Sequence, residues 1–581
     1  MSGAALSQYD YLFAIGTIFA FLDAWNIGAN DVANSWASSV SSRSLTYLQA
    51  MCGASVLEFA GAVGVGGRVA DTIRTKIVDV NAFDESPGLL MLGMVCAVIA
   101  SSVYLTFATK VGFPVSTTHS ILGGVLGMGF GALGSGGVVW VGYKDDGSVD
   151  IQKGVVQVFL AWIIAPVLSG TAGAIIFLAT KYGILLRNNS PLKAILLVPV
   201  YAMLTGVLIS MLLVWKGGGY EVQLSESQIP GVIVGAGAAF GLLVAFFGVP
   251  YLYRLVIKDD WQLRPWHIFQ GPLLLRRGEV PPTPDNYKGR IRDFYEGHLT
   301  KEELTAKRAE EAARRNGDVE ARGEVEKKVV GGEETSDHAS EEEQTKKPGL
   351  VGPKPEAPIY SPAFLWWGLK FIFLRGVDRD IVASQKTDNI VGGDVAEIHT
   401  HAQHFDNRSE FAFTFLQIMT ASTASFVHGA NDVANAIGPF ASIYQIWRTG
   451  VVPGSEANVP IWILAFGGAG IAVGVWTYGY RIMANLGNRV TLMSPSRGFS
   501  MELGSVIAVV IATRLGKFGS LNPLLNRFLL TAGQNFPSRL LSASPAPSSV
   551  SVSAMASGAL SIGAWLLGST WVGSSPCPLL V

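Results

Sequence analysis

The sequence predicts an all-α polytopic membrane protein of two inverted repeats with broken or re-entrant helices and a large cytoplasmic loop between the halves. Of the 581 residues, 49% are hydrophobic and only 15% are charged, a balance typical of membrane proteins. Apolar segments of about 20 residues, the length of a membrane span, recur along the chain. The sequence Gly-Ala-Asn-Asp-Val-Ala-Asn occurs twice, at 28–34 and 429–435, and interrupts a long apolar segment each time. A duplicated polar break of this kind favours a transporter whose site is shared between two repeats.

The composition also excludes several classes of protein. The net charge of -1 gives no argument for binding nucleic acid. Cys52, Cys96 and Cys577 are too few to indicate a disulfide framework or a metal site. No cleavable signal peptide is expected, because the first apolar run lacks a basic region before it. The lipid bilayer is therefore an expected partner, and nucleic acid is not.

The N-terminal repeat is assigned to residues 1–256. Its first span is long because the second half of the span carries the motif, which indicates a broken or re-entrant helix. Irregular backbone at that depth is tolerated only where protein or a water-filled cavity covers it. Seven spans are expected, near 10–38, 48–67, 89–109, 119–142, 154–180, 192–215 and 231–256.

Basic residues set the expected orientation. Arg43, Lys110 and the basic groups at 181–193 and 254–258 fall in alternate loops, which the positive-inside rule places in the cytoplasm. The basic loop at 68–76 is an exception to this pattern. We therefore expect the N-terminus outside the cell and the protein in the plasma membrane.

Residues 257–410 are expected to form the cytoplasmic loop, largely disordered at 301–357. The run from 301 to 347 is rich in Glu, Lys and Arg and has few aromatic residues, which predicts a solvated segment with a helix over 301–315 at most. A regulatory platform is the alternative, because Ser336 and Ser340 lie in an acidic setting that suits phosphorylation.

The C-terminal repeat is assigned to residues 411–516 and is truncated relative to the first. Spans are expected at 411–440, 460–484 and 500–515. Seven spans precede the loop, and an odd number between the two copies of the motif inverts the second copy relative to the first.

Four stretches, in order, resemble the inorganic phosphate transporter (PiT) family, most closely its fungal sodium-dependent symporters. They are the two motif copies, Pro-Val-Ser-Thr-Thr-His at 114–119 and Pro-Ser-Arg-Gly-Phe-Ser-Met-Glu-Leu at 495–503. The resemblance covers residues 8–516. It implies a symporter, not an enzyme, that imports phosphate with sodium by alternating access between the repeats. No cofactor is expected beyond the co-transported sodium, and a homodimer is left open.

Phosphate carried through a membrane must exchange its water for other donors. Amide and hydroxyl groups in the motifs, with backbone N–H groups at the starts of half-helices, are the expected donors. No lysine or arginine lies inside either motif, whereas two carboxylates do, and these would repel phosphate unless cations bind with it. We therefore expect sodium at Asp31 and Asp432. The expected substrate-binding residues are Asn30, Asp31, Ser116, Thr117, Thr118, Asn431 and Asp432, and those for cation binding or coupling are Asp31, Asn34, Glu58, Asp432, Asn435 and Glu502.

Other interpretations of these residues remain open. The motif amides and carboxylates could cap broken helices, and the hydroxyls at 116–118 could bond back to their own helix. His119 and His428 are expected to be structural, and Arg497 to be an inner anchor or part of the anion path. At the level of function, the alternatives are a proton-coupled phosphate or sulfate transporter and a non-transporting phosphate sensor or receptor.

The stretch 517–581 departs from the family, because a second Pro-x-Ser-Thr-Thr motif is expected there and a Ser/Pro/Ala-rich sequence stands instead. We expect this atypical tail to be a retained intron followed by the true exon in the wrong frame, since 516–518 can be encoded with a 5′ splice signal. A transcript that reads through this junction with no intron removed would contradict the expectation. A genuine tail predicts impaired transport.

Overall fold

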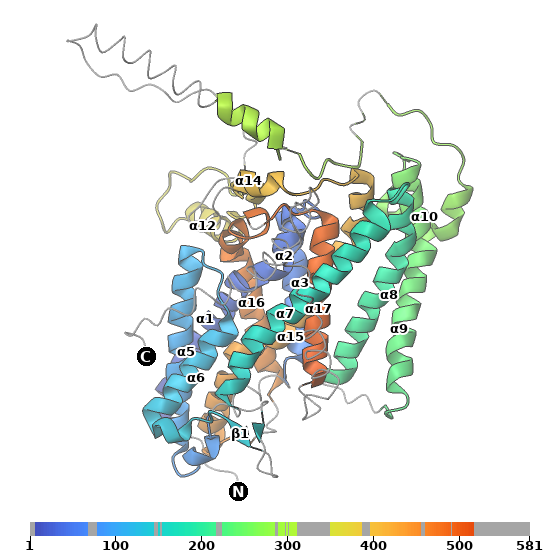
Figure 1. The fold of residues 1–581 in the computed structure, drawn as a ribbon. Coiled ribbons are helices and arrows are strands. Elements are labelled where there is room, and N and C mark those ends of the chain that lie inside the picture. Colours follow the sequence, from blue (N-terminus) through green and yellow to red (C-terminus); the bar gives the residue numbers. More distant parts are fainter. Residues whose placement is uncertain are drawn as a thin grey trace, which may run out of the picture.

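The protein is a bundle of long helices, and in this computed structural model most of them run between two ends of the molecule (Figure 1). The start of the chain lies at one end, and the segments that connect the two halves lie at the other, here called the loop side. The structure describes residues 6–67, 78–143, 149–150, 154–216, 224–284, 287, 289–296, 298–299, 301–310, 349–385, 395–454, 459–489 and 491–515.

The first half contains the larger number of helices and one short hairpin. Its strands, β1 (Gly142–Tyr143) and β2 (Val149–Asp150), pair antiparallel. The helices are α1 (Asp10–Asn30), α2 (Val32–Ser41), α3 (Tyr47–Val65), α5 (Pro87–Val111), α6 (Thr117–Leu133), α7 (Val155–Thr180), α8 (Ser190–Lys216), α9 (Ile229–Leu243) and α10 (Val249–Leu252).

The second half and the connecting segment contribute the remaining helices. A helix also covers residues 301–310, as expected from their sequence. The connecting segment holds α12 (Pro362–Leu374), α13 (Ile381–Ser384) and α14 (Val395–Thr400), and the second half holds α15 (Asn407–Thr449), α16 (Ile461–Ala484) and α17 (Pro495–Leu515).

Local sequence signals fix the ends of the helices that carry the motifs. A capping box formed by Thr46 and Gln49 starts α3, and the Ser116 hydroxyl accepts a hydrogen bond from a backbone N–H at the start of α6. Gly112 and Gly450, both at positive φ, end α5 and α15. Capping residues and glycines in the sequence thus determine where these helices begin and end.

The two copies of the motif differ in local structure. The first copy spans a break, because α1 ends at Asn30 and α2 begins at Val32, with Asp31 at the junction. The second copy lies inside α15, which runs without interruption for 43 residues. The broken helix expected from the sequence is thus present in the first copy, whereas the second copy is continuous. A straight helix of that length is about 65 Å long, roughly twice the hydrocarbon thickness of a bilayer.

The helices that carry the two copies cross antiparallel. The Phe13 ring, near the start of α1, stacks on the Trp447 ring near the end of α15, with 4.4 Å between centroids. The Leu6 backbone N–H also donates to the Trp447 carbonyl. An antiparallel crossing is what inverted repeats require, and the repeat itself stays a prediction.

Matching glycine contacts surround the two copies. A Cβ on Gly28 would lie 1.9 Å from the carbonyl oxygen of Ile471 in α16, and a Cβ on Gly474 would lie 1.9 Å from that of Trp25 in α1. Around the second copy, Gly429 meets the Glu58 carbonyl of α3, and Gly61 of α3 meets the Phe426 carbonyl. In each pair the carbonyl lies three residues before the partner glycine. The α1/α16 and α15/α3 contacts are therefore built alike, and each joins the first half to the second.

Among the described residues, seven helices are long and apolar enough to cross a membrane. The ten spans expected from the sequence also included α6, α15 and α17. Of these, α6 is only 17 residues long and ends at Leu133, so the expected span at 119–142 was too long. Both α15 and α17 carry polar and charged residues along their length and are less apolar than the others.

The connecting segment is more structured than expected at its second end. Residues 349–357 are described, and α12 is an apolar helix that was not expected from the sequence. Its Leu365 and Trp366 are 59% and 62% exposed. With 13 residues, α12 is too short to span a bilayer. The expectations for 311–348 and for the tail at 517–581 fall outside the described residues.

Candidate functional site

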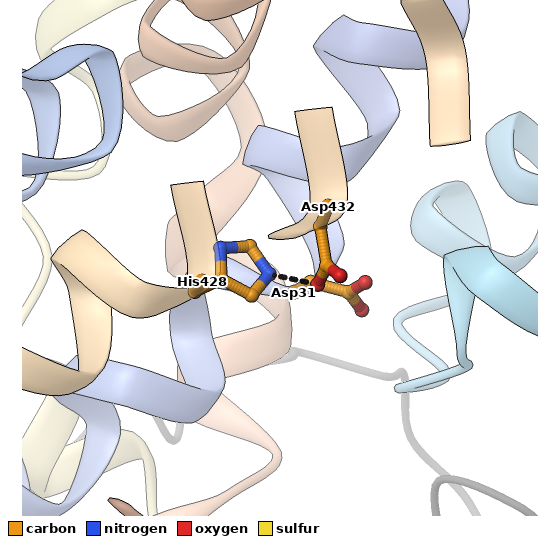
Figure 2. A group of neighbouring side chains, drawn as sticks. All are labelled: Asp31, His428 and Asp432. Atoms are coloured by element: carbon orange, nitrogen blue, oxygen red, sulfur yellow. Dashed lines mark ion pairs between the residues drawn. The ribbon is translucent and has the colours of Figure 1, made fainter. Parts of the chain in front are cut away.

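The aspartates of the two motif copies meet in the middle of the bundle. Ligand atoms of Asp31, Asp432 and His428 all lie within 4.8 Å of one another, and Figure 2 shows the two carboxylates side by side with the His428 ring against Asp432. Asp31 is 5% exposed, and its Oδ1 is buried without a hydrogen-bond partner. Two carboxylates in contact, one with an unused oxygen, form a set of donors that suits a hard cation.

Thr117 holds the Asp31 carboxylate in place. Its hydroxyl donates to Asp31 Oδ2 at 2.6 Å and accepts from Asn435 Nδ2 at 3.1 Å. Asn435 also donates to the Thr118 hydroxyl at 3.0 Å. The hydroxyl stretch at the start of α6 therefore touches the first motif through Asp31 and the second through Asn435, as a shared site requires. The start of α6 also places the positive end of its helix dipole here.

Asn30 has a different position from the one expected for an anion ligand. Its amide nitrogen donates to the Thr109 hydroxyl at 3.2 Å and to the Phe113 carbonyl at 3.0 Å. Its amide oxygen accepts from the Val115 N–H at 3.0 Å. Asn30 thus holds the connection between α5 and α6 against the break in α1, and it positions the hydroxyl stretch.

His428 was expected to be structural, yet it lies between two carboxylates of the site. Its Nε2 is 2.7 Å from Asp432 Oδ2, and its Nδ1 is 2.7 Å from Glu58 Oε2. Glu58 is fully buried and also accepts from the Ser425 hydroxyl at 2.7 Å. The contact with Glu58 is a hydrogen bond, whereas Nε2 makes no hydrogen bond and is close to Asp432 by distance alone. The spacing of His428 and Asp432, one helical turn apart, could have indicated this pairing.

Glu502 lies on the loop side of the aspartates in a group of hydroxyls. It accepts from Ser38 at 2.5 Å and Ser39 at 3.3 Å, both in α2, and from Thr420 of α15 at 2.5 Å. Glu502 was expected in the site from the sequence, but these hydroxyl partners were not, because serine and threonine in apolar helices usually bond back to their own backbone.

A cavity of about 300 Å³ extends between Asp432 and Glu502. Asn34 and Asn431, both expected in the site, line it together with Asp432 and Glu502. Ser116 caps α6 through the His119 N–H at 3.4 Å, consistent with the alternative that this hydroxyl serves its own helix. The structure thus gathers most of the expected residues around the paired aspartates, whereas Glu58 and Asn30 do not line the cavity.

A bundle of membrane helices with paired carboxylates, amides and hydroxyls buried at its centre defines a polytopic transport protein for ions. Residues 27–520 match the phosphate transporter family, so the chain belongs to that family. The resemblance expected from the four motifs is confirmed, and the family consists of membrane transporters, not enzymes.

Similar phosphate transporters from other organisms agree with this assignment. The chain is 56% identical over 531 residues to the phosphate-repressible phosphate permease pho-4 of Neurospora crassa, which covers 88% of both chains. It is 25% identical over 620 residues to sodium-dependent phosphate transporter 1 of Mus musculus, which covers 89% of both. A solved structure described as the sodium-dependent phosphate transporter matches with a TM-score of 0.53 and 24% identity over 97% of this chain and 100% of that one, which shows the shared fold.

Proposed function

We propose that this member of the phosphate transporter family is a sodium-coupled symporter that imports inorganic phosphate across the plasma membrane by alternating access. The observation that carries the proposal is the meeting of the buried Asp31 and the half-buried Asp432, one from each motif copy, at a single position. Two carboxylates leave no place for an anion unless cations bind with it. Cation coupling then follows from the charges.

Sodium fits this position better than a larger or softer ion. The available donors are carboxylate, amide and hydroxyl oxygens, and Asp31 Oδ1 is unused. Relatives described as sodium-dependent phosphate transporters support the same choice. We assign sodium to the paired aspartates and phosphate to Ser116, Thr118 and Asn431, close to the start of α6, with Thr117 positioning Asp31.

The aspartates also favour phosphate over sulfate. Monohydrogen phosphate carries a proton that it can donate to an aspartate oxygen, whereas sulfate at neutral pH carries none. Arsenate keeps its proton and should compete for the site. A sulfate ion would instead place acceptor against acceptor, with both groups unsatisfied.

Labelled phosphate uptake into cells that lack their own phosphate transport tests the proposal. We expect uptake in sodium medium, little in choline medium, competition by arsenate and none by sulfate. Asp31→Asn and Asp432→Asn should each lower uptake at least tenfold, which equals about 1.4 kcal/mol. The control is Asp10→Asn, at the exposed start of α1, where the asparagine oxygen can still accept from Trp447 Nε1.

Two results would count against the proposal. Equal uptake by the two aspartate variants and by Asp10→Asn would contradict the assignment of the site to Asp31 and Asp432. Phosphate binding to purified protein without any uptake by cells that display it at the surface would favour the phosphate sensor instead.

A proton-coupled transporter is a second candidate, and the chain Glu58–His428–Asp432 is the observation that favours it. Both ring nitrogens of His428 face carboxylate oxygens, so a proton can bind here when sodium does not. Uptake driven by an inward pH gradient in choline medium, and lost in His428→Gln, would support the second candidate over the first.

A further inference from the structure

Asp23 is a buried carboxylate that lies outside the site described above. Asp23 is in α1, two helical turns before Asp31 on the N-terminal side, and is 0% exposed. Eight residues of α-helix separate the two by about 12 Å. No ion pair of Asp23 is found among the described residues, and Asp31 further along the chain is another carboxylate. Nothing in the proposed mechanism uses Asp23.

The hydrogen bonds around Asp23 leave it poorly satisfied. The Ser102 hydroxyl lies 3.4 Å from Asp23 Oδ1, but its single proton has a better acceptor in the Phe19 carbonyl at 2.9 Å. Asp23 Oδ2 is buried with no hydrogen-bond partner. The Ser101 hydroxyl lies against the same carboxylate in a geometry that makes no hydrogen bond.

Asn26, one turn further along α1, adds a second unpaired acceptor. Its amide nitrogen donates to the carbonyls of Leu22 at 3.0 Å and Ser102 at 3.3 Å. Because both partners can only accept, they fix which side of the amide is nitrogen. The amide oxygen on the other side is buried with no partner. Asp23, Asn26 and Ser101 are all at most 1% exposed.

Three unpaired oxygens of these types call for a bound group that supplies positive charge. Buried polar atoms are nearly always satisfied, and an exception commonly marks an ion or water. Carboxylate, amide and hydroxyl oxygens are the ligands of hard cations. We propose that Asp23, Asn26 and Ser101 form a second sodium site between α1 and α5, on the N-terminal side of the paired aspartates.

The second half of the chain has a carboxylate at the corresponding interface. The like-built glycine contacts relate α1 to α15, and α5 packs on α1 as α17 packs on α15. Glu502 of α17 meets Thr420 of α15 at that interface, on the loop side. The paired aspartates thus lie between Asp23, toward the N-terminal end of the molecule, and Glu502, toward the loop side. The Asp23 site would bind cations that enter from the N-terminal end.

This inference rests on the proposed sodium coupling, so its test counts bound sodium directly. The experiment measures the binding of radioactive sodium to the purified full-length protein in lipid nanodiscs, at pH 6.5 and 8, with choline replacing sodium. We expect Asp23→Asn to bind one fewer sodium ion than the unsubstituted protein at both pH values. Ser101→Ala should weaken the binding of that ion on the order of tenfold.

Ser101→Ala is a second variant of the same site, included in case Asp23→Asn fails to fold. It should fold normally, because the hydroxyl that it removes makes no hydrogen bond in the structure. Asp10→Asn is the matched control on the same helix and should bind as the unsubstituted protein does. Unchanged sodium binding in both Asp23→Asn and Ser101→Ala overturns this inference alone. A change in proton binding with unchanged sodium binding overturns it in favour of a proton site, and an unsubstituted protein that binds no sodium overturns the proposed sodium coupling as well.

Discussion

At the scale of single residues, the site depends on side chains that orient the carboxylates. Asp31 Oδ2 is fixed by the Thr117 hydroxyl, which is itself fixed by Asn435. The other oxygen, Oδ1, is buried and has no hydrogen-bond partner. One half of the carboxylate is therefore held so that the other half is available to a ligand. Groups in such supporting positions usually matter nearly as much as the ligands themselves.

Thr117→Val tests this positioning role, because valine keeps the shape and loses the hydroxyl. We expect the sodium concentration for half-maximal phosphate uptake to rise about 10- to 100-fold, while uptake at saturating sodium falls less. Thr17→Val is the control, since the Thr17 hydroxyl bonds only the Phe13 carbonyl of its own helix. A half-saturating sodium concentration equal in the two variants would show that Thr117 does not position Asp31.

The sequence could predict some of these residues and not others. Asp31 and Asp432 were accessible because an identical seven-residue sequence stands twice in apolar surroundings. His428 precedes the second copy and has no counterpart before the first, where Ile27 stands, so the duplication gave no signal for it. Asn30 and Asn431 look equivalent in the motif, but only contacts from α5 and from the connection that follows it show that both ends of the Asn30 amide are hydrogen-bonded within the protein.

At the scale of helices, the glycine in each motif copy permits a neighbouring helix to approach its backbone. Gly28 meets a carbonyl of α16 and Gly429 meets a carbonyl of α3, both at distances that no side chain could occupy. Small residues allow this close packing in membranes, where there is little hydrophobic drive between helices. The first residue of the motif is therefore explained by packing, and its polar residues by the site.

Gly28→Ala should disrupt this packing. The added methyl group would overlap the Ile471 carbonyl, so α1 and α16 must separate, at a cost of about 1–3 kcal/mol or more. We expect a lower melting temperature of the purified protein and loss of uptake. Gly123→Ala in α6 is the control, because a Cβ there has nothing within 4 Å. Equal melting temperatures of the two variants would contradict the packing role.

The positions of the helices could be predicted from hydropathy better than their lengths. The expected spans fall on helices throughout, since runs of about 20 apolar residues have few other solutions in a bilayer. The end of α6 and the whole of α12 were misjudged, because apolar residues also occur in loops and short surface helices. Hydropathy also could not show that the second copy, unlike the first, lies in an unbroken helix.

At the scale of the whole molecule, part of the connecting segment fastens the two halves together on the loop side. Residues 289–296, here called the strap, lie across the helix ends. Glu296 pairs with Arg43, beyond the end of α2, at 2.7 Å. Tyr295 donates to the buried Glu410 of α15 at 3.0 Å and accepts from the Phe405 N–H at 3.1 Å. The strap therefore contacts one helix end from each half.

The two attachments of the strap should differ in strength. Tyr295→Phe leaves the buried Phe405 N–H without its acceptor, and we expect the strap to lose about 1–3 kcal/mol of local stability. Arg43→Ala removes an ion pair whose Glu296 side chain is 72% exposed, and we expect a loss of about 1 kcal/mol at most. Hydrogen exchange of a peptide covering 289–296 measures both. Faster exchange in Arg43→Ala than in Tyr295→Phe would contradict this ranking.

The crossed glycine contacts have a consequence for biosynthesis. Because α1 packs against α16 and α3 against α15, neither half of the bundle can complete its core until the other has been made. The ribosome adds Ile471 roughly 440 residues after Gly28, a delay of tens of seconds at about 5–20 residues per second. During that time α1, with Asp23 and Asp31, is in the membrane without its final neighbours. It is then exposed to lipid, to assembly factors and to quality control.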